Sequence, residues 1–90
     1  MSNTPHASDP MRVRWYRARS LPALGDAVRG AREVRGLTQD QLADMIGSSR
    51  PTLSRLERGQ AVSAGTVLDA LARCGYEVVV VPRGAQVSVS

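Results

Sequence analysis

The chain has 90 residues and a formal net charge of +4, and all twelve of its basic residues are arginine. This length allows one small domain with a low buried fraction, so help from dimerisation would be unsurprising. The single cysteine, Cys74, excludes an internal disulfide and a cysteine-rich metal site, and no apolar run approaches the length of a membrane span. We therefore expect a cytoplasmic protein with no membrane contact, no bound metal and no cofactor.

Positive charge is concentrated near the N-terminus, where residues 1–20 carry four arginines against one aspartate, whereas residues 36–90 are balanced. An excess of basic over acidic residues favours a polyanionic partner. We expect residues 1–19 to form a flexible basic arm that is disordered over its polar first ten residues. In residues 11–19 apolar side chains alternate with arginine. That pattern predicts either an arm that follows nucleic-acid phosphates or a solvated leader or strand packed on its own domain, and we favour the second interpretation.

The first predicted helix spans about residues 20–35. Ser20 can cap it, and Pro22 is tolerated in the first turn because the amide that it lacks would be unpaired there. Gly36 ends the helix. One apolar stripe at helical spacing is expected to face the core, and it comprises Leu21, Leu24, Val28 and Ala31, followed by Arg32 or Arg35.

A second helix is predicted from residue 39 to about residue 46. Thr38 can cap it, and Gln41 lies three residues later, where a capping box is completed. Gly47 lies just past the end, where a helix needs a residue in the left-handed conformation to stop.

A third helix is predicted over about residues 50–58. Ser49 can cap it, and Pro51 is tolerated in its first turn. Apolar residues of the second and third helices fall on the faces that would meet, which is the spacing of a helix-turn-helix, and these residues are Leu42, Ala43, Ile46, Leu53 and Leu56.

A fourth helix is predicted from its cap at Ser63 to its stop at Gly75, which closes a domain over residues 20–75. Its core face is assigned to Val67, Leu68, Leu71 and Ala72.

Residues 76–81, which include four consecutive valines, predict a β-strand within a C-terminal segment over residues 76–90. A lone strand after four helices has no partner in its own domain unless residues 11–16 or 86–89 pair with it. Because an unpaired apolar strand is an aggregation liability, something should cover it. We predict a two-fold dimer with this strand at its interface, through Tyr76, Val78, Val79, Val80 and Val81.

Three pieces of the chain resemble the DNA-binding domain of phage repressors and their bacterial relatives, the xenobiotic-response-element (XRE) family. They are residues 37–43 (LTQDQLA), 46–47 (IG) and 53–59 (LSRLERG), and the resemblance covers about residues 24–75. It implies an all-α domain of four to five helices. Residues 68–83 (LDALARCGYEVVVVPR) further resemble the last helix and terminal strand of HipB-type antitoxins, in which terminal strands of two protomers pair.

The predicted third helix presents several side chains outward once its two leucines turn inward. Arg55 is the best candidate for recognising a base, because its planar fork matches the two acceptors on guanine. The resemblance implies that Arg50, Pro51, Thr52 and Arg55 contact bases. The alternative is a basic face that is merely solvated.

Gln39 resembles the glutamine that opens the second helix of these repressors and hydrogen-bonds a DNA phosphate. The alternative is an ordinary surface glutamine. The full set of residues assigned to phosphate contact is Thr38, Gln39, Ser49 and Arg58.

Arg32 and Glu57 match the positions of a partly buried ion pair in repressors of this family. The resemblance implies a structural role for the pair, which would fix the third helix against the first. Loss of either partner should cost more than loss of an exposed pair, because the other charge is left buried.

The favoured hypothesis is a dimeric, sequence-specific repressor that binds double-stranded DNA at an inverted repeat, with recognition helices about 34 Å apart. As a HipB-like antitoxin it would also bind a HipA-like kinase toxin and repress its own operon. One alternative is a stand-alone phage or bacterial repressor without a toxin. Another is a protein-interaction module on the same fold, for which the balanced charge of residues 36–90 leaves room.

The sequence argues against an enzymatic activity. The one histidine, His6, lies in the polar leader, and no nucleophile, base or paired carboxylates converge in one predicted site. Gly25 and Gly30 form no phosphate-binding loop, because no strand precedes them.

Overall fold

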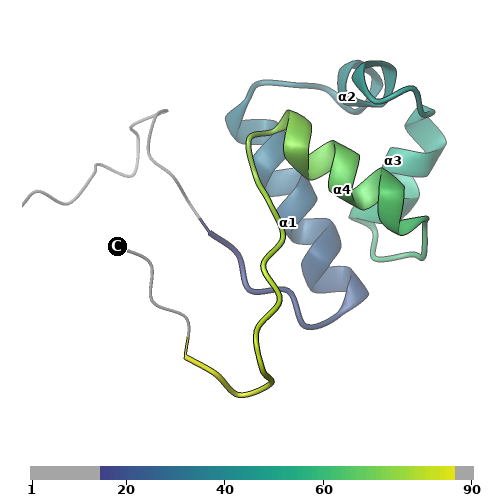
Figure 1. Cartoon of the computed structure of the whole chain (residues 1–90). Coiled ribbons are helices and arrows are strands. Elements are labelled where there is room, and N and C mark those ends of the chain that lie inside the picture. The colour runs from purple at the N-terminus through teal and green to yellow at the C-terminus, as the bar shows by residue number, and fades with distance from the viewer. Residues whose placement is uncertain (1–14, 87–90) are drawn as a thin grey trace, which may run out of the picture.

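The computed structural model describes residues 15–86. Over this range the chain is all-α, and its four helices are α1 (Leu21–Val34), α2 (Gln39–Met45), α3 (Arg50–Glu57) and α4 (Ala64–Arg73) (Figure 1). The expected all-α class is therefore confirmed, with helix ends within one or two residues of those predicted. None of these four helices has both the length and the apolar character that crossing a membrane requires.

Each helix begins at the hydroxyl side chain that the sequence assigns to its N-cap. Every cap accepts a hydrogen bond from the backbone amide three residues later, which satisfies one of the amides that a helix start leaves unpaired. The capping residues are Ser20, Thr38, Ser49 and Ser63. At α2 the capping box is complete, since the Gln41 side chain also accepts from the Thr38 amide at 2.8 Å.

Helix α3 packs against α1 and α2, and α4 packs against the same two helices from another side (Figure 1). Gly25 lies where α1 crosses the end of α3. A Cβ atom at this position would collide with the backbone carbonyl oxygens of Leu56 and Glu57. The absence of a side chain at Gly25 therefore sets how closely the helix-turn-helix approaches α1.

The core is built from the inner faces of all four helices. Its most buried large side chains are Val28, Leu42, Leu53 and Leu56. Cys74 closes the core beside α4 as a free thiol, and burial raises the pKa of this thiol. This placement suits a small core residue rather than an exposed reactive one.

The predicted core face of α4 is wrong in part. Leu68 is 51% exposed and Ala72 is also exposed, whereas Ala70 is fully buried. The buried positions on α4 are Val67, Ala70, Leu71 and, just beyond its end, Cys74, which follow the spacing i, i+3, i+4 and i+7 of one helical face. Leu21, which was placed on the inner stripe of α1, is likewise half-exposed.

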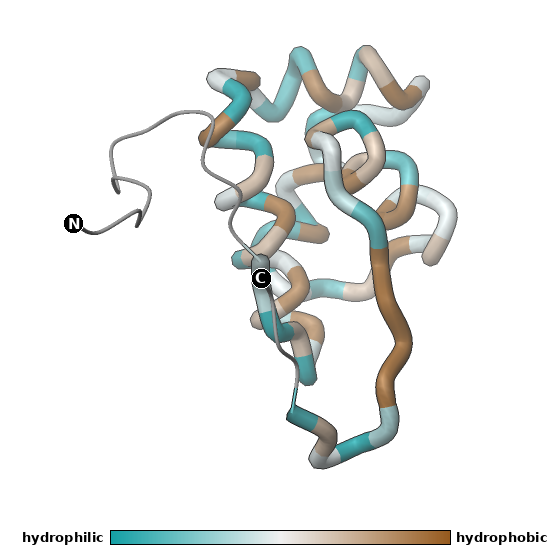
Figure 2. The backbone as a smooth tube through the Cα atoms, turned by 60° about the vertical axis from the view of Figure 1, so that its left-hand side comes forward, coloured by the Kyte–Doolittle hydropathy of each residue, from teal (hydrophilic) through white to brown (hydrophobic). Residues whose placement is uncertain are grey.

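The strand predicted over residues 76–81 does not form in this chain. The residues that the structure describes contain no strand, and this segment runs without regular structure. Figure 2 shows its four valines, residues 78–81, as a continuous hydrophobic run along the outside of the helices. A strand needs a hydrogen-bonding partner, and of the two candidate partners residues 11–14 and 87–89 lie outside the described range.

The segments that flank the domain meet each other at one point. The rings of Tyr16 and Tyr76 lie with their centroids 5.9 Å apart and their planes tilted by 54°. The Tyr16 ring also packs on α1, since a Cβ atom at Gly30 would collide with its hydroxyl. In the described end of the N-terminal arm Tyr16 is thus packed on the domain, whereas Trp15 and residues 17–19 are exposed, and residues 1–14 lie outside the described range.

Candidate nucleic-acid interface

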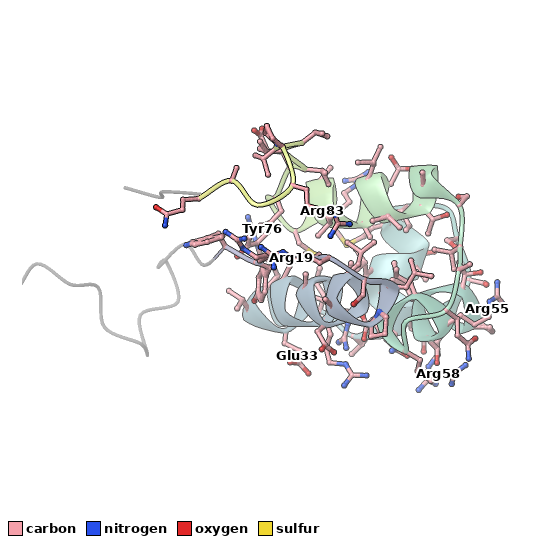
Figure 3. The ribbon with its side chains drawn as sticks, turned by 90° about the horizontal axis from the view of Figure 1, so that it is seen from below. Arg19, Glu33, Arg55, Arg58, Tyr76 and Arg83 are labelled. Carbon is pink, nitrogen blue, oxygen red and sulfur yellow. The ribbon has the colours of Figure 1, made fainter. Side chains whose placement is uncertain are left out.

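The outward face of α3 carries only positive charge. Arg50, Arg55 and Arg58 are exposed, Leu53 and Leu56 are buried, and the single acidic residue of the helix, Glu57, points inward. Figure 3 shows Arg55 and Arg58 projecting from the same side of the domain, away from the end that holds Tyr76. This helix therefore offers an exposed basic surface to a partner.

The angle between α2 and α3 depends on the turn that joins them. Gly47 has φ of 65°, in the left-handed region that a residue with a side chain rarely adopts. The Ser48 amide donates to the Ala43 carbonyl at 2.8 Å, which closes the turn, and Ser49 then caps α3. The sequence thus fixes where α2 stops and the direction in which α3 leaves.

The hydroxyl groups at the starts of α2 and α3 are partly committed within the protein. The Thr38 oxygen accepts from the Gln41 amide at 3.0 Å, and the Ser49 oxygen accepts from the Thr52 amide at 3.4 Å. The Ser49 and Thr52 hydroxyls also lie 3.0 Å apart. Each hydroxyl has one proton to donate and two lone pairs that accept. The Thr38 proton is therefore left for a partner. Because one of the Ser49 and Thr52 hydroxyls donates to the other, one of their two protons is left as well.

Glu57 lies in the interior, with none of its side chain exposed. Arg32 of α1 binds it through two hydrogen bonds, from Nε to Oε2 at 2.7 Å and from Nη2 to Oε1 at 2.9 Å. A further Arg32 nitrogen donates to the Leu37 carbonyl at 2.8 Å. One arginine thus links α1, the start of the helix-turn-helix and the end of α3.

Two more side chains reach the same carboxylate. The Gln39 amide nitrogen at the start of α2 donates to Glu57 Oε1 at 3.0 Å. Arg29, one turn before Arg32 on α1, donates from Nε to the same oxygen at 3.4 Å, and its side chain is 48% exposed. Gln39 is therefore anchored to the interior, unlike an ordinary surface glutamine.

These contacts decide the ionisation of Glu57. Burial taken alone would raise its pKa, but the hydrogen bonds from Arg32, Gln39 and Arg29, with the charge of Arg32, outweigh burial and hold the pKa below its ordinary value. The same bond to Glu57 raises the pKa of Arg32. The carboxylate is therefore charged and fully engaged at neutral pH.

Arg29 was missed in the sequence analysis. Its spacing to Arg32 was a usable signal, because residues three apart lie on the same face of a helix. A sequence that places a buried glutamate opposite Arg32 therefore also brings the side chain at Arg29 within reach.

The fold and the surface together define a small helix-turn-helix domain. The second helix of the motif, α3, has a basic outward face. The helix-turn-helix family HTH_3 matches residues 28–79, more than half of the chain, and the chain belongs to this family. The family is one of DNA-binding domains of XRE-type transcription regulators and is typically non-enzymatic. No match to the chain is found among curated proteins.

Proposed function

We propose that the protein is a sequence-specific transcriptional repressor that inserts α3 into the DNA major groove. The observation that carries this proposal is the outward face of α3, on which the exposed charges are all positive and stand on a helix held rigidly by its cap and by Glu57. The chain also belongs to a family of DNA-binding domains, so the polyanion that this face would bind is DNA.

In this proposal α3 recognises bases through Arg50, Pro51, Thr52 and Arg55. Arg55 is exposed and lies in the last turn of the helix, and its guanidinium can donate two hydrogen bonds to a guanine. Pro51 has no amide donor, so its contact would be apolar, as with a thymine methyl group. Specificity would therefore depend most on Arg55.

The phosphate contacts are proposed to come from Thr38, Gln39, Ser49 and Arg58. The Gln39 amide has two hydrogens and gives one to Glu57, so the second can be donated to a phosphate oxygen. The hydrogen bond to Glu57 also fixes which atom of the amide is the nitrogen. These contacts would place the domain on the duplex without recognising sequence.

We also propose that the operator is an inverted repeat bound by two copies of the chain. Val79 and Val80 are 69% and 92% exposed, and they belong to the apolar run at residues 78–81. A second copy would bury this run in a two-fold interface and supply the strand partner that is not found among residues 15–86 of one chain. The resemblance of this tail to HipB-type antitoxins supports the same arrangement.

On that resemblance we propose a further partner, a HipA-like kinase toxin. The test is co-expression with any kinase-like reading frame next to the gene. Stable co-purification of the two products would support an antitoxin, and independent elution would leave a stand-alone repressor.

Repression itself is tested with a reporter gene under the DNA upstream of the protein's own gene. The protein should lower expression, and Arg55→Ala should abolish most of that effect. Arg73→Ala is the matched control, because Arg73 is equally an exposed arginine but lies on α4, which is outside the helix-turn-helix. Equal repression by the wild type and both variants would argue against base recognition by α3.

A further inference from the structure

The cluster around Glu57 contains one more positive charge than is needed to neutralise the carboxylate. Arg32 alone satisfies both oxygens of the carboxylate, at 2.7 and 2.9 Å. Arg29 adds a second guanidinium at the longer distance of 3.4 Å. Because two arginines face one carboxylate, the cluster keeps a net charge of +1, and this surplus charge lies at the half-exposed Arg29.

The hydrogen bond to Glu57 orients Arg29 without using up its donors. Only Nε of Arg29 is engaged within the part of the chain that the structure describes, so four of its five N–H donors are left for a partner. The buried carboxylate thus holds Nε of a side chain that is 48% exposed, and within the described residues it leaves the terminal nitrogens for another partner. A side chain held in this way loses less entropy on binding than a free arginine.

Arg29 and Gln39 are neighbours because they donate to the same oxygen atom. Nε of Arg29 and Nε2 of Gln39 lie 3.4 and 3.0 Å from Glu57 Oε1. Each side chain therefore presents spare N–H donors beside the other, one charged and one neutral. Such a pair suits a single tetrahedral anion with several acceptor oxygens.

We propose that Arg29 and Gln39 together bind one phosphate of the DNA backbone, with Glu57 as the buried residue that positions both. This inference rests on the proposed function and adds to it a phosphate contact from α1, a helix outside the helix-turn-helix. It also gives Glu57 a second role, since the same carboxylate that joins α1 to α3 would orient a DNA contact.

The test measures binding of fluorescent DNA duplexes at about 50 and 200 mM salt. Probes are the DNA upstream of the gene and a scrambled duplex, because a phosphate contact is independent of sequence. Arg29→Ala should weaken both by the same factor and reduce the slope of log affinity against log salt by about 0.9 for each Arg29 that touches a phosphate. Arg29→Lys should keep the slope, and Arg73→Ala, on α4 beside Met45, should change neither quantity.

A double-mutant cycle tests whether the two side chains share a phosphate. If they do, Arg29→Ala with Gln39→Ala should cost less than the product of the two separate losses. Replacing one phosphate after another by a neutral methylphosphonate should reveal a position that weakens wild-type binding but not that of Arg29→Ala.

If Arg29→Ala leaves both the affinity for DNA and the salt slope unchanged, the shared phosphate contact is overturned, and the proposed repressor function is not affected. A wild-type protein that binds neither duplex would overturn both.

Discussion

Glu57 carries a negative charge inside the domain, with no part of its side chain exposed. The desolvation of a buried carboxylate is costly, and good geometry with several donors is what offsets it. Arg32, Gln39 and Arg29 supply those donors from two helices. The consequence is asymmetric: the intact cluster is tolerated, whereas removal of Glu57 or of Arg32 leaves a buried charge without its main partner.

Glu57→Ala should therefore lower the melting temperature strongly. Breaking a buried pair costs about 3–5 kcal/mol, which corresponds to a drop of more than about 10 °C for a domain of this size. Glu33→Ala is the matched control, because Glu33 is an exposed acid on the same helix as Arg32 (Figure 3). Thermal unfolding followed by circular dichroism measures both variants. An unchanged midpoint for Glu57→Ala would show that the cluster around Glu57 does not stabilise the fold.

The lowered pKa of Glu57 also predicts a pH dependence. A carboxyl group whose pKa is depressed in the folded state stabilises the fold fully above its ordinary value of 4.5, and this contribution is lost as the pH falls through the lowered value. The free energy of unfolding of the wild type should therefore fall below about pH 4.5 more steeply than that of Glu57→Gln. Chemical denaturation across this range gives the comparison, and parallel curves would contradict it.

At the scale of the elements, the contact of α1 with α3 depends on Gly25. Gly25→Ala should destabilise the domain by about 1–3 kcal/mol, because the added methyl group meets backbone carbonyls that cannot move aside. Gly65→Ala is the control, since the nearest atom to a Cβ there is 3.9 Å away and alanine favours the helix. Unfolding in urea should separate the two variants, and equal midpoints would show that α1 can shift away from α3 freely.

Local rules were enough to predict the helices. Hydroxyl caps at Ser20, Thr38, Ser49 and Ser63 and a glycine after each helix fix the ends through neighbours in sequence. The face of α4 was less predictable, because Leu68 is as apolar as Leu71 and only the position of α1 and α2 decides which of them is buried.

The candidate site was predictable to a similar extent. The outward residues of α3 follow from periodicity, and Arg32 opposite Glu57 follows from the family pattern. The approach of Arg29 and Gln39 to one oxygen depends on how three helices meet in space. Spacing within one helix could suggest Arg29 but could not place it beside α2.

At the scale of the whole molecule, the apolar segment at residues 78–81 lies outside the domain rather than in it (Figure 2). Val80 is 92% exposed and gives the folded single chain almost no burial. Val80→Asp should therefore leave the fold of a single chain intact and dissociate the proposed dimer, as measured by analytical ultracentrifugation. Leu68→Asp is a control at a half-exposed site on α4. A wild type that sediments as a monomer at high concentration would rule out the dimer.

The most direct test of the whole account is fluorescence anisotropy with the DNA upstream of the gene and a scrambled duplex of equal length. The wild type should prefer its own upstream DNA by about a hundredfold or more, within the range of specific recognition. Arg55→Ala should lose most of that preference and melt like the wild type, since Arg55 is exposed and outside the core. Equal affinity of the wild type for both duplexes, or a preference that survives in Arg55→Ala, would contradict the claim that α3 recognises the sequence of an operator.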